Sequence, residues 1–306
     1  MVTSPSILSK TIALPTSRKR RRDISPMGVV VALGLIAYLV GMFGIPFYRA
    51  IWLSFHNWDF IVDARYVGTR NYEKSVNDDY FWQAVRVTLL FAVARIVLSL
   101  TVSFFIALGI SQLPSRIRNA YIGFFYIPVV VPGVVSILLW KWLYLPTGGA
   151  FNSLLGKFGI AEQPFLNSSS QALWCILLLS LWSGIGGSII IFFAGINDVP
   201  VDLLEAARLD GAGLWKQTIH IVLPLLKPVI FYEVVVGIIT AVQMFEIFFL
   251  MSGPGFSTRV LSVYTYELGF KSLNLGYGAT ISMFIFGGLL FATIFQFRRF
   301  MKSQYV

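Results

Sequence analysis

Long runs of apolar residues recur along this chain, and they restrict its fold more than any other feature. Two of them, Ala172–Asn197 and Val229–Met251, exceed the roughly 20 apolar residues that a helix needs to cross a bilayer. Of 306 residues, 57% are apolar or aromatic and only 12% are charged. A soluble domain of that composition would expose a largely hydrocarbon surface. The sequence therefore predicts an all-α integral membrane protein.

Six spans are predicted within one transmembrane domain, residues 27–306, preceded by a disordered cytoplasmic tail over residues 1–26. The spans are expected at about 27–55, 82–112, 120–145, 172–197, 229–251 and 276–297. The third span contains two prolines in the stretch Ile127–Gly133. Proline removes a backbone donor and clashes with the preceding turn, so this span is expected to be broken.

Basic residues indicate how the six spans are oriented. Fourteen Lys and Arg residues fall in the tail, the 113–119 loop, the 199–228 loop and the C-terminal segment, against six in the alternate loops. Basic residues are retained on the cytoplasmic side during insertion, so both termini and the 199–228 loop are expected there. Insertion also accounts for the net charge of +10, so no nucleic-acid partner is expected.

The chain lacks the residue sets that catalysis or metal binding require. Its single cysteine, Cys175, lies in an apolar run, and His56 and His220 fall in different loops. The nearest approach to a phosphate-binding loop, Gly149–Phe158, has the wrong spacing and no hydroxyl after its lysine. We therefore expect no catalytic residue, metal or cofactor in this chain, and a membrane enzyme finds no support.

The loop at 199–228 is too apolar to be a slack linker. Asp202 and Glu205 have the spacing of a capping box, which predicts a helix starting there. Gly211 and Gly213 predict a sharp turn, followed by a second short helix that ends at the prolines Pro224 and Pro228. Apolar residues at helical spacing are expected to share one face: Leu203, Leu204, Ala207 and Leu214. Such a helix–turn–helix beside a membrane requires a protein partner.

Ionisable residues inside spans are costly and indicate function or pairing. Lys141 lies near a helix end and can extend to the interface. Arg86 and Glu233 are expected close to an interface. Arg95 and Glu246 lie deeper, and either an ion pair between them or a ligand role fits the sequence.

Four residues are candidates for a substrate path. Gln243 and Glu246 are three apart on the expected fifth helix and so on one face. Asn274 and Tyr277 lie at the start of the sixth helix. Amide, carboxylate and aromatic groups of this kind suit an uncharged, hydroxyl-rich ligand such as a sugar.

The loop sequence resembles a known motif, the EAA loop of permease subunits of binding-protein-dependent ABC importers. The matching positions are Glu205-Ala206-Ala207, Asp210-Gly211-Ala212, Ile221 and Leu223-Pro224. Val199-Pro200, Met251-Ser-Gly-Pro-Gly and Leu275-Gly-Tyr-Gly-Ala279 resemble the carbohydrate branch of that family, the maltose, lactose and glycerol-phosphate permeases. One departure is Thr218, which stands where the family often has an aromatic residue.

The resemblance implies a six-helix permease with a cytoplasmic coupling helix, in a bacterial or archaeal plasma membrane. The ATPase-coupling residues would be Glu205, Ala206, Ala207, Asp210, Gly211 and Leu214. Implied partners are a second permease subunit forming a heterodimer, two ATPase subunits that bind ATP and Mg, an extracellular solute-binding protein and membrane lipid. The expected cargo is a sugar or oligosaccharide. Alternatives are another solute, such as a sugar phosphate or polyol, or a self-sufficient secondary transporter or channel.

Overall fold

The structure is a computed structural model that describes residues 26–304, so the tail expected at 1–26 lies outside it apart from Pro26. The chain divides into two compact units, Met1–Tyr48 and Arg49–Val306, and each is described by itself. Helices dominate the described residues. Within residues 26–304, five helices are long and apolar enough to cross a membrane, or six if one bent pair counts as a single span.

The first unit contains α1 (Pro26–Leu39) and a π-helical turn at Val40–Gly44, after which α2 (Ile45–Ser54) begins. The wider turn falls where Pro46 enters the helix. Because proline cannot donate to the carbonyl four residues earlier and clashes with it, a π turn just before it relieves the conflict. The side chains of Met27–Tyr48 are exposed within this unit, which suits contact with lipid or protein.

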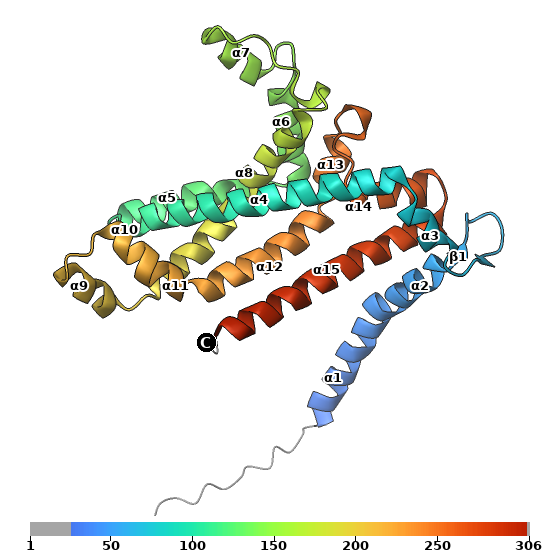
Figure 1. Cartoon of the computed structure of the whole chain (residues 1–306), viewed down its shortest axis with the longest axis horizontal. Helices are drawn as coiled ribbons and strands as arrows, with labels where there is room; N and C mark the ends of the chain where they lie inside the picture. Colours follow the sequence, from blue (N-terminus) through green and yellow to red (C-terminus); the bar gives the residue numbers. More distant parts are fainter. Residues whose placement is uncertain (1–25, 305–306) are drawn as a thin grey trace, which may run out of the picture. The chain divides into compact units, whose positions relative to one another are not determined.

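In the second unit, four long helices carry the core: α4 (Asp79–Ser111), α8 (Ala172–Asn197), α12 (Lys227–Gln243) and α15 (Leu275–Gln304). Helix α4 packs against both α8 and α12, and α12 packs against α15 (Figure 1). Phe91 on α4 and Phe248 lie edge to face in one buried cluster, and Phe104 meets Phe192 in another.

The span expected at 120–145 is broken at its proline pair. Helices α5 (Ser115–Val130) and α6 (Gly133–Leu143) meet at an angle of 93°. Pro132 caps α6 in an extended conformation (ψ 134°) and cannot continue α5. Gly186 on α8 allows the backbone of Phe125 to approach so closely that any side chain there would collide. The bend is therefore set by proline and the packing by glycine.

The span expected at 229–251 is also broken, which the sequence did not predict. Helix α12 ends at Gln243, Met244 is extended (ψ 115°), and α13 runs from Glu246 to Leu250. Ser262 Oγ donates to the Met244 carbonyl at 2.8 Å and stabilises the break. The prediction that Gln243 and Glu246 share one helix face is therefore wrong, because they belong to different helices.

Shorter elements join these helices. They are β1 (His56–Asn57), β2 (Arg65–Tyr66), α3 (Arg70–Val76), α7 (Ala150–Lys157), η2 (Phe165–Asn167), η4 (Pro254–Phe256), α14 (Leu261–Tyr266) and η5 (Glu267–Lys271). The two strands pair antiparallel, with His56 opposite Tyr66. Gly276 at the start of α15 lies so close to the His56 carbonyl that a side chain there would collide.

Candidate functional site

A helical hairpin occupies the loop at 199–228. It contains α9 (Val201–Leu209), α10 (Leu214–Gln217), a π turn η3 (Thr218–Val222) and α11 (Leu223–Leu225). Helix α9 begins after Pro200, and no side chain caps it. The expected cap at Asp202 is therefore wrong. Asp202 lies in the first turn instead, where a carboxylate favours the positive end of the helix dipole.

The turn of the hairpin is built around Gly211. Its φ is +79°, a conformation that glycine adopts without strain. The Gly211 N–H donates to Arg208 O at 3.0 Å and the Ala212 N–H donates to Ala207 O at 2.8 Å. These two bonds form a Schellman motif and satisfy the last carbonyls of α9. The sharp turn expected at this glycine is therefore present.

The surface of the hairpin is apolar where the loop meets solvent. Leu209 is 90% exposed and Trp215 is 61% exposed, and Leu203 and Leu214 are also exposed. Leu204 instead packs against a buried core cluster, so the expected shared face is divided between the core and the outside. Of the expected coupling residues, Glu205, Ala206, Asp210, Gly211 and Leu214 are exposed, and Ala207 is half-buried.

The second half of the hairpin does not end at its prolines, contrary to the prediction. The chain stays helical through η3 and α11 into α12, because Pro224 and Pro228 each fall in a first turn, where an N–H is not needed. Thr218 is 2% exposed and its Oγ1 has no partner within residues 26–304. The departure from the family pattern therefore faces the chain's own interior.

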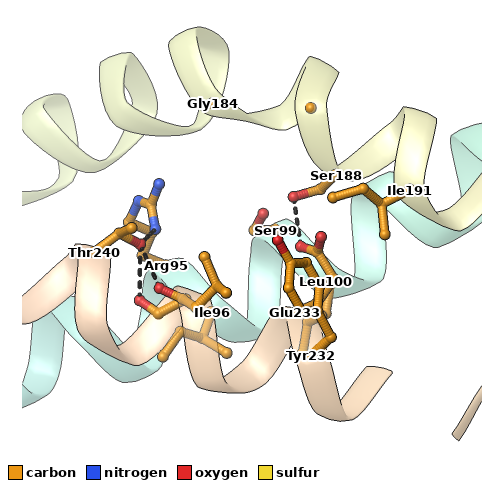
Figure 2. A pocket seen from close by; sticks show the side chains of 13 residues that line it. Arg95, Ile96, Ser99, Leu100, Gly184, Ser188, Ile191, Tyr232, Glu233 and Thr240 are labelled. Carbon is orange, nitrogen blue, oxygen red and sulfur yellow. Dashed lines mark hydrogen bonds between the residues drawn. The ribbon is translucent and has the colours of Figure 1, made fainter. Parts of the chain in front are cut away.

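A first cavity of about 200 Å³ lies between α4, α8 and α12. Arg95 Nη1 donates to Thr240 Oγ1 at 3.3 Å, and Ser188 Oγ donates to Glu233 Oε2 at 2.7 Å. Figure 2 shows the Arg95–Thr240 pair at one end of the cavity and the Ser188–Glu233 pair at the other. Each charged group is thus held by a neutral hydroxyl.

Arg95 does not pair with Glu246, so the predicted alternative of an ion pair between these two residues is wrong. Ion pairs in the part of the chain described here join Arg259 and Lys271 to Glu267. Arg95 shares its cavity with Glu233, which the sequence placed near an interface. The association was missed because residue spacing gives no information on which helices adjoin.

A second cavity of about 430 Å³ lies where the two broken spans meet α8. Glu246 lines it, with Ser136, Ser180 and Ser183. The Ser136 Oγ is buried and has no partner among the described residues. A Cβ on Gly133 would lie 3.1 Å from Glu246 Oε2, so glycine leaves room for the carboxylate. Hydroxyls, a carboxylate and freed backbone groups suit a hydroxyl-rich ligand.

The other candidates for the substrate path lie elsewhere. Gln243 lines a third cavity with Ser262, Thr265 and Ser282. Tyr277 is 1% exposed, and its backbone N–H donates to Asn274 Oδ1 at 3.2 Å at the start of α15. The structure therefore does not bring the four residues together, and Asn274 and Tyr277 line neither of the first two cavities.

Tyr277 belongs instead to a polar cluster centred on Asp78. Asp78 Oδ2 accepts from Tyr264 at 2.5 Å and from Tyr277 at 2.6 Å, and Oδ1 accepts from the Tyr80 N–H that opens α4. Burial is the largest influence and would raise the pKa of Asp78, but these hydrogen bonds outweigh it and hold the pKa below its ordinary value. Burial, with the bond to Asp78, raises the pKa of Tyr264.

Comparisons with known proteins agree with this architecture. Residues 99–301 match the family of the binding-protein-dependent transport system inner membrane component, and the chain belongs to that family. It is a multi-pass component of a transport system in the inner membrane, and the system includes a binding protein.

Two relatives match almost their full length. The probable ABC transporter permease protein YesP of Bacillus subtilis is 29% identical, covering 93% of this chain and 94% of that protein. The trehalose/maltose transport system permease protein MalF of Thermococcus litoralis is 29% identical, covering 91% of this chain and 95% of that protein. A bacterial alginate ABC transporter, solved with its pentasaccharide-bound periplasmic protein, has a chain of the same fold. That chain has a TM-score of 0.80 at 21% identity, over 88% of this chain and 92% of its own.

Proposed function

We propose that the chain is a permease subunit of an ATP-driven, binding-protein-dependent importer for a sugar or oligosaccharide. It works as one half of a heterodimer with a second permease subunit. Two ATPase subunits bind ATP and Mg, and a solute-binding protein delivers the ligand from outside. Both termini and the hairpin at 199–228 lie in the cytoplasm, where the ATPases reach the hairpin. The similarity to a trehalose/maltose transport system permease supports the sugar assignment.

The observation that carries this proposal is the helical continuity between the hairpin and α12. The chain is helical from Leu214 to Gln243 apart from the turn residue Leu226. Hydrogen bonds of helical spacing cross that residue, because the Leu226 N–H donates to Val222 O and the Ile230 N–H donates to Leu226 O, each at 2.9 Å. Helix α12 supplies Glu233 and Thr240 to the first cavity and ends at the break beside the second. A force on the hairpin is therefore transmitted to one wall of each cavity.

The hairpin surface has the properties that contact with an ATPase groove would require. Ala206 is exposed and small, which permits close approach, and Leu209 and Leu214 supply apolar contact. Gly211 fixes the angle between the two short helices. Closing of the ATPases on ATP would then move the hairpin, and α12 with it, so that the cavities open alternately to the two sides. A secondary carrier or channel has no need of such a hairpin.

Uptake into proteoliposomes tests the proposal. The vesicles contain this chain, its partner permease and both ATPases, with binding protein outside and ATP inside. Labelled maltose, trehalose, a polyol and a sugar phosphate are compared as cargo. We expect saccharide uptake that requires ATP, and we expect Gly211→Pro and Glu205→Lys to abolish it while the complex still inserts.

Matched controls separate coupling from folding. Gly213 has an ordinary extended conformation (φ −70°), so Gly213→Ala is expected to keep uptake near the wild-type rate. Uptake without ATP would favour a secondary carrier. Normal uptake by both hairpin variants would remove the coupling assignment. Uptake of the polyol or sugar phosphate alone would replace the sugar assignment and leave the importer intact.

A further inference from the structure

Arg95 lies within a membrane-spanning helix and makes no direct ion pair with a carboxylate among residues 26–304. Its Nε is buried and makes no hydrogen bond in the described part of the chain. Its contact with Thr240, at 3.3 Å, is longer than a charge-assisted bond of 2.7–2.9 Å. A charged group at this depth normally faces a counter-charge or a functional cavity. In this cavity the carboxylate of Glu233 acts on Arg95 from the opposite end and not by direct contact (Figure 2).

The space beside the guanidinium is kept open by small residues. Three glycines line the cavity: Gly184, Gly187 and Gly237. A Cβ on Gly184 would lie 3.2 Å from Arg95 Nη2, so a larger residue there would press on the guanidinium. Three helices thus leave a polar group facing an open, largely apolar space.

Glu233 attracts Arg95 across the cavity but does not contact it. Its Oε2 accepts from Ser188, and the pair lies at the far end of the cavity (Figure 2). No ion pair joins Glu233 to Arg95 among the described residues, whose salt bridges involve Glu267. The cavity therefore presents the guanidinium donors of Arg95 at one end and the carboxylate acceptor of Glu233 at the other.

We infer that this cavity recognises an acidic saccharide, whose carboxylate pairs with Arg95 and whose hydroxyl donates to Glu233. This rests on the proposed function as a sugar importer. The planar guanidinium matches a carboxylate with two parallel hydrogen bonds. A neutral sugar would offer Arg95 only uncharged acceptors, which form weaker hydrogen bonds with a guanidinium than a carboxylate does. A doubly charged phosphate would bring one more negative charge than a carboxylate into a cavity that already contains Glu233.

The test is equilibrium dialysis with the purified complex of both permeases and both ATPases. Digalacturonate and dimannuronate are each compared with the same disaccharide methyl-esterified at its carboxyl groups, which removes the charge and keeps the sugar. We expect the acids to bind more tightly than their esters. Arg95→Gln should weaken binding of the acids on the order of tenfold or more, the contribution of a charge-assisted hydrogen bond, and leave the esters unchanged.

Two further variants make the result specific. Arg86 is an exposed arginine on the same helix, so Arg86→Gln should leave all four affinities unchanged. Arg95→Lys keeps the charge without the fork and should give an intermediate affinity, which also guards against a folding defect in Arg95→Gln. Equal binding of acids and esters, or an equal loss for both in Arg95→Gln, would overturn the inference and leave the sugar importer standing. Binding of neither acids nor esters would also overturn the inference, whereas the importer itself is decided by the uptake of maltose and trehalose into proteoliposomes.

Discussion

Asp78 illustrates how one side chain can join three elements of a membrane protein. It caps α4 and accepts hydrogen bonds from the hydroxyls of Tyr264 on α14 and Tyr277 on α15. Tyr277 was expected on the substrate path because it is an aromatic residue at the start of a span. Its partner lies 199 residues away in sequence, so the structural role could not be read from local spacing.

Replacing Asp78 with Asn should destabilise the protein and remove part of its sensitivity to acid. Each lost bond to a charged acceptor is worth about 1.5–3 kcal/mol. Because the folded-state pKa of Asp78 is lowered, its contribution is present above the unfolded-state pKa of about 3.9 and is lost as pH falls below it. Thermal unfolding in detergent at pH 7 and below pH 4 measures both effects. An unchanged melting temperature at pH 7 would contradict this role.

Glu246 is the predicted path residue that lines the larger polar cavity. Glu246→Ala should raise the KM for saccharide uptake about tenfold, since a hydrogen bond to a charged group is worth about 1.5–3 kcal/mol. Gln243→Ala alters a separate cavity and should act independently, so that the double variant shows the product of the two effects. Uptake kinetics in proteoliposomes measure this. Normal uptake and specificity in the double variant would remove both residues from the path.

At the scale of elements, prediction succeeded where a residue type dictates the backbone. Helix α8 has the bounds expected from its apolar run, the break at Pro132 follows from proline, and the turn at Gly211 follows from glycine. The break at Met244 lies in a stretch with neither proline nor glycine, and it depends on a tertiary bond from Ser262. The cavities lie between helices that are distant in sequence, so their composition required the fold.

A buried hydroxyl on α4 also holds the first residue of α14. Thr88 Oγ1 accepts from the Leu261 N–H at 2.9 Å and donates to Ala84 O at 2.7 Å. Thr88→Val keeps the shape but leaves a buried N–H unpaired, at a cost of about 1–3 kcal/mol. We expect a lower melting temperature and faster amide exchange over residues 261–266. Thr88→Ser restores the acceptor and should recover most of the protection. Equal exchange in all three proteins would rule out the attachment.

For the whole molecule, the distribution of basic residues predicts the orientation in the membrane. Helix α9 and helix α7 lie in loops on opposite sides of the predicted topology. Leu209 ends α9 and Phe158 directly follows α7, and both side chains are highly exposed. Leu209 is 90% exposed and Phe158 is 75% exposed. The single native cysteine, Cys175, is buried. The chain is therefore suited to labelling of introduced cysteines.

Leu209→Cys and Phe158→Cys should react with a membrane-impermeant maleimide from opposite sides. In cells whose outer layer admits the maleimide but whose plasma membrane is intact, we expect labelling at position 158 only. In inside-out vesicles, position 209 should be labelled and position 158 protected. The wild-type protein should remain unlabelled in both because Cys175 is buried. Labelling of position 209 from outside would reverse the topology and remove the hairpin from the reach of any cytoplasmic ATPase. The orientation predicted by basic residues and the coupling role of the hairpin therefore depend on the same measurement.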